Sequence, residues 1–287
     1  FQCLLLMGYA YAHCLNHFLP PRKQAWVHGG LLMMAICTLP ITPSEALQPD
    51  GEGTPVWAIL KLLGLSLGVP YMILSSTGPL VQAWFARAHA GASPYRLYAL
   101  SNVGSLLALV VYPFVVEPWS TRIEQVNGWS WGMALYAVFC GLLVWRMRDV
   151  PVVTSSKSKA ESGATETRLR RAGVWLCWLA LPACGTAFLM ATTNKLCQDV
   201  AVVPFLWVLP LALYLISFII SFDSPRWYVR EIYVPLLVVS WIGVLWGMGE
   251  GVDLEIVLQG GLYSVALFIS CMVCHGELYR LRPEPAR

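Results

Sequence analysis

Three residues near the end of the chain have the spacing of a haem attachment site. Cys271, Cys274 and His275 spell C-x-x-C-H, which in an exported protein can provide two thioether bonds to haem and a histidine ligand to its iron. Bacteria attach haem in this way outside the cytoplasm, so the side of the membrane that His275 faces decides the question. The alternative is a membrane helix that ends at Cys274, with His275 and Glu277 as its first residues in water.

Polar and ionisable side chains within or beside apolar segments form a second set of candidates. Such side chains are costly in lipid, and they are therefore candidates for a substrate path. The set consists of Lys61, Asn102, Ser105, Glu117, Thr193, Asn194, Lys195 and Asp199.

Each of these candidates also has a structural interpretation. Lys61 could snorkel to the outer surface, and Asn102 with Ser105 could serve close helix packing. Asp199 could accept a hydrogen bond from Lys195, four positions earlier, and Glu117 could anchor or cap a helix end. We expect His28 to be a surface or packing residue near a span end, and Trp84 to be an interface aromatic.

Motifs for enzymatic or metal chemistry are missing from the sequence. It contains no G-x-G-x-x-G, P-loop, H-E-x-x-H or G-x-S-x-G motif. The cluster at His275 also offers too few ligands for a zinc site. We therefore predict no catalytic residue, no metal and no cofactor in this chain.

The composition indicates that lipid is the solvent for most of the chain. Of the 287 residues, 57% are hydrophobic and 12% are charged, about half the charged fraction of a soluble protein, and the mean hydropathy is +0.61. A net charge of +3 is too small to indicate a nucleic-acid partner. Phe1 lies inside an apolar run without a charged flank or a cleavage site, so we expect a piece of a longer protein, cut at both ends, rather than a signal peptide.

The elements that must position these residues are membrane-spanning helices, each of roughly 20 apolar residues. The predicted spans are 1–19, 25–41, 56–76, 95–116, 128–146, 173–192, 202–222, 231–248 and 254–274. Residues 78–88 either prolong the third helix or lie along the membrane surface. The predicted fold class is an all-α integral membrane protein, a polytopic bundle with about nine transmembrane helices.

The distribution of basic residues predicts the orientation of these spans. Alternating loops collect 16 of the 19 Lys and Arg on one side, which is therefore the cytoplasmic side. The linker 147–172 and the C-terminal tail lie on that side, and so does His275, which argues against haem. Residues 1–146 then form a first helical half, 147–172 a flexible basic linker, and 173–287 a second half.

Several strings carry a resemblance to a known family. They are GYAYAH at 8–13, PYRLYALSNVGSLLALVVYPFVVEP at 94–118, TTNKLCQDVAVVPFLWVLPLALYLISF at 192–218 and CHGELYRLRPEP at 274–285. Over nearly the whole chain the sequence resembles the membrane portion of bacterial fused major-facilitator-type transporter/spermidine synthase-like proteins. In that family the C-H-G-E-L string occurs without Cys271, the residue at 194 is often His, and a Gly/Asp/Arg-rich motif is usual where this chain keeps only Arg22 and Lys23.

This resemblance implies major-facilitator-like halves in the bacterial inner membrane and a cytoplasmic spermidine synthase-like domain later in the same polypeptide. Any such enzymatic activity would lie in that domain. The chain itself would then transport or shelter a small polar, polyamine-like metabolite along the residues proposed above. The alternative is a membrane anchor or scaffold that transports nothing and holds an aminopropyltransferase- or methyltransferase-like domain at the cytoplasmic face.

Overall fold

Helices make up the described part of the chain. The computed structural model describes residues 2–41, 55–89, 95–148, 166–199, 206–250 and 255–282. Within these ranges there are nine helices of 16 residues or more and no strand. They are α1 (Gln2–Phe18), α2 (Pro21–Cys37), α3 (Pro55–Ala88), α4 (Arg96–Val111), α6 (Arg122–Met147), α7 (Glu166–Asp199), α8 (Val208–Asp223), α9 (Arg230–Glu250) and α10 (Ile256–Arg280).

Six helical segments are long and apolar enough to cross a membrane. They are Val56–Ala88, Arg96–Trp119, Arg122–Met147, Ala172–Gln198, Arg230–Glu250 and Ile256–Arg280, and α8 is a shorter apolar helix. The second of these segments continues from α4 through a π-helical turn, Tyr112–Val116, into the short α5 (Glu117–Trp119). The prediction of an all-α protein with multiple membrane spans is thereby confirmed.

The helices differ from the predicted spans mainly at their ends. α3 continues through Pro70 and Pro79 to Ala88, so residues 78–88 prolong this helix. α7 begins at Glu166, inside the segment predicted as linker, whereas residues 149–165 lie outside the described ranges. α10 extends to Arg280, so the expectation that it ends at Cys274 is wrong.

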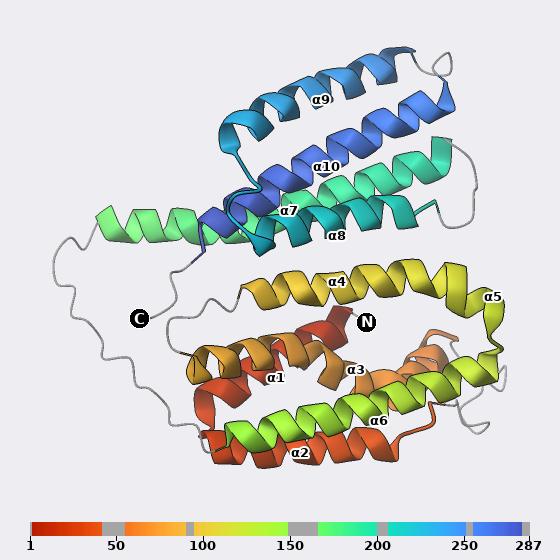
Figure 1. Cartoon of the computed structure of the whole chain (residues 1–287), viewed down its shortest axis with the longest axis vertical. Coiled ribbons are helices and arrows are strands. Elements are labelled where there is room, and N and C mark those ends of the chain that lie inside the picture. Colours follow the sequence, from red (N-terminus) through yellow and green to blue (C-terminus); the bar gives the residue numbers. More distant parts are fainter. Residues whose placement is uncertain are drawn as a thin grey trace. The chain divides into compact units, whose positions relative to one another are not determined.

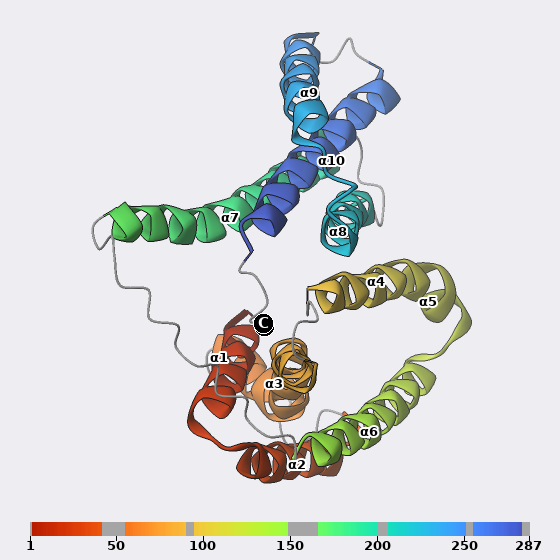
Figure 2. The ribbon, with the colours of Figure 1, turned by 60° about the vertical axis from the view of Figure 1, so that its left-hand side comes forward.

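The helices belong to two compact units. The first contains α1, α2, α3 and α6, and the second contains α4 together with α7, α8, α9 and α10 (Figures 1 and 2). α4 therefore packs with helices that follow it by more than a hundred residues, against α8 above all. The helical halves predicted from the sequence, 1–146 and 173–287, differ from these units in the placement of this helix.

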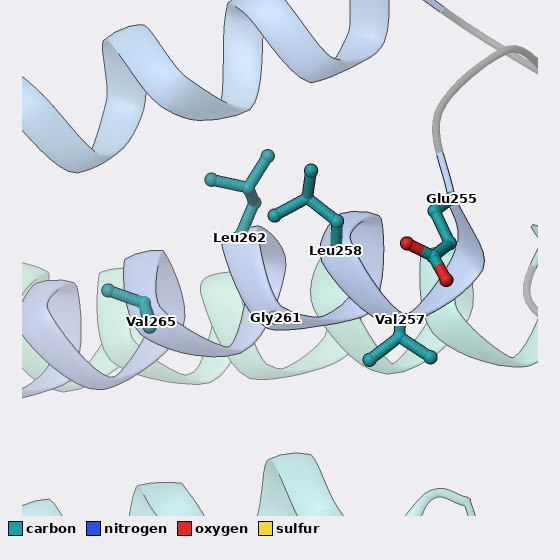
Figure 3. Close-up of a pocket in the computed structure, with 6 residues that line it drawn as sticks. All are labelled: Glu255, Val257, Leu258, Gly261, Leu262 and Val265. Carbon is teal, nitrogen blue, oxygen red and sulfur yellow. The ribbon is translucent and has the colours of Figure 1, made fainter.

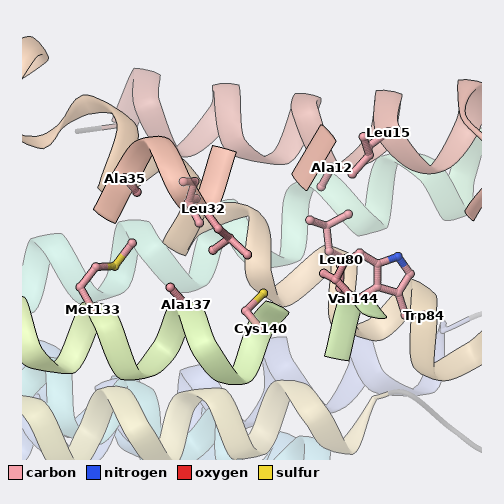
Figure 4. Close-up of a cluster of buried hydrophobic side chains, with 11 residues drawn as sticks. Ala12, Leu15, Leu32, Ala35, Leu80, Trp84, Met133, Ala137, Cys140 and Val144 are labelled. Carbon is pink, nitrogen blue, oxygen red and sulfur yellow. The ribbon is translucent and has the colours of Figure 1, made fainter. Parts of the chain in front are cut away.

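The first unit is built around one apolar cluster. Leu32 and Ala35 of α2 lie against Met133, Ala137 and Cys140 of α6 (Figure 4). α1 lies directly on α3, where a Cβ at Gly8 would overlap the side chain of Ser75. The G-Y-A-Y-A-H string therefore begins with the glycine that permits this close contact between helices.

In the second unit α10 is the central helix, in contact with α7, α8 and α9. Trp241 of α9 donates from Nε1 to Ser270 Oγ over 3.2 Å. Trp178 of α7 donates from Nε1 to the carbonyl of Leu281 over 3.1 Å. These bonds tie both neighbours to α10, which carries His275.

Candidate functional site: a buried histidine in the second unit

His275 lies inside the second unit and not in water. Its side chain is 1% exposed, and α10 continues for five residues beyond it. The expectation that it is the first wet residue after a helix end is therefore wrong. The ring faces α8 because Ser217, Tyr214 and Phe218 of that helix lie against it.

The hydrogen bonds of Ser217 determine the tautomer of an uncharged His275 ring. The hydroxyl of Ser217 donates its single hydrogen to the carbonyl of Tyr214, over 2.7 Å. Its oxygen also lies 3.1 Å from His275 Nδ1. Since that hydroxyl hydrogen is already used, Nδ1 must carry the hydrogen and donate to Ser217.

The other ring nitrogen of His275 is then a buried acceptor. Nε2 has no hydrogen-bond partner within the described part of the chain. A Cβ added to Gly185 of α7 would lie 3.7 Å from it. The rings of Tyr214 and Phe218 stand edge-on, with centroids 4.8 and 4.9 Å from that of His275. An unpaired acceptor in such surroundings is costly, and a ligand that donates a hydrogen bond would remove that cost.

Both cysteines of the C-x-x-C-H spacing are buried beside the histidine. Cys271 is 0% exposed and Cys274 is 6% exposed. A porphyrin bonded to both thiols would have to displace the helices that cover them. Among the described residues no group of three or more His, Cys, Asp or Glu side chains could hold a metal ion.

The residues that follow His275 form a polar cluster at the end of α10. Glu277 Oε1 accepts from the hydroxyl of Tyr228 over 2.9 Å, and Arg230 Nε and Arg280 Nη1 lie 3.3 and 3.5 Å from the same oxygen. A Cβ at position 276 would overlap the ring of Tyr228, so Gly276 makes room for that ring. Burial, and secondly the bond to Glu277, raises the pKa of Tyr228 above its usual value.

The remaining predicted site residues of the second unit lie at separate places. On α4, Asn102 donates to the carbonyl of Tyr98 and Ser105 to that of Ser101, over 2.8 and 3.2 Å. Thr193, Asn194 and Lys195 lie near the end of α7. Asp199 is the last residue of that helix, and its side chain is outside the described part.

The structure does not bring the Thr193–Lys195 cluster to His275. His275 Nε2 lies 3.7 Å from a Cβ built on Gly185 of α7, whereas the cluster begins eight residues later, at Thr193. Eight residues span about 12 Å along the helix axis. The cluster and His275 therefore lie about two turns of α7 apart, and Leu196, next to the cluster, packs with Tyr263 near the start of α10.

The two candidates of the first unit are surface residues. Lys61 is exposed in the second turn of α3, and Glu117 is exposed at the start of α5. Neither belongs to the buried cluster of that unit.

The first unit contains a second buried polar network, which the sequence did not lead us to expect. His28 is 0% exposed, with Nδ1 3.1 Å from the hydroxyl of Tyr11 and Nε2 3.5 Å from the sulfur of Cys140. Gln24 Oε1 accepts from Trp84 Nε1 over 3.1 Å and from Arg87 Nη1 over 3.4 Å. Trp84 is 3% exposed, so the expectation that it is an interface aromatic is wrong, whereas His28 is a packing residue. The spacings Gln24/His28 and Trp84/Arg87, each on one helix face, are the signal that could have revealed the network.

A hollow at the start of α10 is a poor candidate for a site. It has a volume of about 600 Å³, and its lining residues are Glu255, which precedes α10, and residues of the first turns of that helix, among them Leu258 and Val265 (Figure 3). Leu258 and Val265 are each about half exposed. Exposed aliphatic side chains on one face of a membrane helix are what lipid contact requires.

Comparison with known proteins gives no match, so the chain is classified by its helical fold. No protein-family model matches the chain, and no curated protein or solved structure is significantly similar to it. Its helices and their hydropathy identify it as a helical multi-pass integral membrane protein.

Proposed function

We propose that this chain is the membrane domain of a spermidine synthase-like fusion protein with major-facilitator-like halves, and that it transports or shelters a small polar, polyamine-like metabolite. The observation that carries the proposal is the buried acceptor nitrogen of His275, which has no partner among the described residues. An ionisable side chain buried within membrane helices is a candidate functional site by default.

The chemistry of the site favours an amine. An ammonium group has only donors, and Nε2 of His275 is an acceptor, so the two are complementary. No acidic side chain is needed for this contact, which suits a metabolite that must be released again.

The residues proposed from the sequence would serve as the approach to this site. Thr193, Asn194, Lys195 and Asp199 would form one mouth, and Asn102 and Ser105 would lie along the path. Lys61 and Glu117 would act at the outer ends of their helices. The same proposal places the chain in the inner membrane of a bacterium, with its linker and tail in the cytoplasm. The spermidine synthase-like soluble domain would lie later in the same polypeptide.

A specific observation also favours the non-transporting anchor. Asn102 and Ser105 donate to carbonyls of their own helix, as polar residues do when they serve packing alone. In an anchor, His275 would then serve packing of α8 against α10 and nothing else.

Uptake of labelled spermidine into proteoliposomes separates the two functions. Under the transport proposal, His275→Phe abolishes uptake, and Asn102→Ala and Asp199→Asn reduce it, with each protein still inserted. The matched control is His13→Phe, which makes the same change at an exposed histidine of α1 and leaves uptake unchanged. If the unaltered chain gives no uptake above empty liposomes, or if His275→Phe keeps it, transport through this site is excluded and the anchor function is favoured.

A further inference from the structure

A groove on the first unit has the dimensions and polarity of a lipid-binding site. It lies between α2 and α6, and its volume is about 950 Å³. Its floor contains Gly29, Gly30 and Gly141, so the backbones are uncovered there. Leu32, Ala137 and Val144 line the groove and also belong to the buried cluster where the two helices pack together (Figure 4).

The side chains change in the same order along both walls. On α2, Arg22 is followed by Trp26, then by the glycines and then by Met33. On α6, taken from its end backward, Arg148 is followed by Trp145, then by Gly141 and Val138. The two helices run antiparallel, so both arginines lie at the same end of the groove (Figures 1 and 4).

This order matches the polarity of a phospholipid. Arginine is suited to bind a phosphate, tryptophan prefers the depth of the headgroups, and the aliphatic walls suit an acyl chain. Met33 is 11 positions after Arg22, and Arg148 is 10 positions after Val138, so each stretch spans about 15 Å of helix axis. That length equals half of a hydrocarbon core about 30 Å thick, which is the depth of one leaflet.

Exposure of the groove is consistent with a ligand that comes from the bilayer. Trp26 is 82% and Trp145 62% exposed, and Met33 and Leu142 are about 60% exposed. The guanidinium of Arg148 lies 3.5 Å above the ring of Trp145, which holds this arginine at the rim. Because its apolar side is open, the groove should bind an anion that carries an acyl chain more tightly than a water-soluble anion.

We infer that this groove binds one anionic phospholipid, with its phosphate at Arg22 and Arg148 and an acyl chain over Gly29, Gly30 and Gly141. Anionic lipids of the cytoplasmic leaflet are attracted to basic side chains at the membrane surface, and basic pockets between transmembrane helices bind their headgroups. The predicted orientation puts the arginine end on the cytoplasmic side. This inference does not depend on the proposed transport function.

The test uses the full chain, delipidated in detergent and titrated with phosphatidylglycerol, with bound lipids counted by native mass spectrometry. We expect one tightly bound lipid, and roughly 25-fold weaker binding in the double variant Arg22→Gln/Arg148→Gln, about fivefold for each arginine. The matched control is Lys23→Gln/Arg146→Gln, which removes two neighbouring charges that do not line the groove. It should change binding less than threefold.

A second variant tests the groove without changing its charge. Gly141→Leu places a side chain where an added Cβ meets nothing within 4 Å, so the protein should fold while the acyl site is filled. We expect this variant to lose the bound lipid. Equal binding of phosphatidylcholine, equal loss in the Lys23/Arg146 control, retention in Gly141→Leu, or displacement of the lipid by inorganic phosphate would each overturn the inference.

Discussion

At the scale of single residues, the C-H-G-E-L string is explained by the contacts of three neighbours. His275 bonds to Ser217, Gly276 makes room for the ring of Tyr228, and Glu277 accepts from the hydroxyl of that tyrosine. The string thus fixes the loop before α9 to the end of α10 and at the same time buries the imidazole. The three side chains have different structural roles, so we expect substitutions at the three positions to have different effects.

Gly276→Ala should destabilise the protein by about 1–3 kcal/mol, because the added methyl group overlaps the ring of Tyr228 and forces it to move. The matched control is Gly261→Ala in the same helix, where an added Cβ meets nothing within 4 Å. That change should be neutral or slightly stabilising, since alanine favours helix more than glycine does. Unfolding in mixed micelles measures both, and equal stability of the two variants would refute the assigned role of Gly276.

The raised pKa of Tyr228 predicts that the protein loses stability at high pH. Its pKa in the folded protein is raised above that of the unfolded chain, which is near 10. Below pH 10 both states hold the proton, and above it the unfolded chain releases the proton first, so the free energy of unfolding falls as pH rises through this window. The contribution of one such group is at most about 1.4 kcal/mol per pH unit.

Tyr228→Phe should remove this part of the pH dependence, because it lacks the ionisable hydroxyl. The measurement is the free energy of unfolding between pH 9 and 11 for both proteins. Tyr112→Phe, at a half-exposed tyrosine of the second unit, is the control and should keep the dependence. Identical slopes for Tyr228→Phe and the unaltered chain would contradict the proposed environment.

The site shows what local sequence can and cannot predict at this scale. The C-x-x-C-H spacing drew attention to His275, and the expected helix end at Cys274 drew attention to Glu277 with it. Their environment was not predictable, since Ser217 and Tyr228 lie 58 and 49 residues earlier in the chain. The partners of Gln24 and His28 also come from other helices, so only the spacing of these two residues on their own helix could have indicated that network.

At the scale of elements, hydropathy predicted every described helix of 16 residues or more, and its errors lie at helix ends and at the short α5, which was not predicted. α10 continues past the apolar run because Tyr279 is buried against Phe222. A hydropathy pattern cannot predict such a contact between helices. α3 continues through two prolines because membrane helices tolerate them. The start of α6 depends instead on a local signal, a capping box.

Thr121→Ala should lower the stability of the first unit by about 1 kcal/mol. Thr121 Oγ1 accepts from the backbone N–H of Glu124, and the Glu124 carboxylate accepts from the backbone N–H of Thr121 over 2.7 Å. Ser130→Ala is the matched control, because its hydroxyl bonds to a carbonyl of the same helix and caps nothing. The measurement is the free energy of unfolding of both variants. An equal loss of stability in the two would show that the capping box contributes no stability.

At the scale of the whole molecule, the helical halves predicted from the sequence differ from the contact units. α4 precedes the linker in the chain, but its Ala99 packs with Phe222 and Tyr279 of the second unit, and Arg96 lies 3.3 Å from Asp223. Hydropathy alone could not predict this, because it gives helices and not their neighbours. The assignment of sides from 16 of 19 basic residues stays a prediction of the sequence.

The placement of α4 predicts that the chain can be cut in two and still assemble. Fragments 1–155 and 156–287, expressed together, should copurify because α4 of the first completes the second unit. Ala99→Trp should reduce copurification at least tenfold, since Ala99 is buried in that contact. Leu107→Trp, at an exposed position of the same helix, is the control and should not reduce it. Copurification that survives Ala99→Trp unchanged would refute this packing.

His275 presents to a polar ligand a buried acceptor that has no partner in the described ranges, and nitrogen NMR of the chain labelled at its five histidines tests this assignment. His275→Asn identifies the resonances, and spermidine is then titrated. We predict a ring with its hydrogen on Nδ1, and an Nε2 resonance that shifts on addition of spermidine while those of His13 do not. A hydrogen on Nε2, or an Nε2 resonance that spermidine leaves unchanged, would contradict the account.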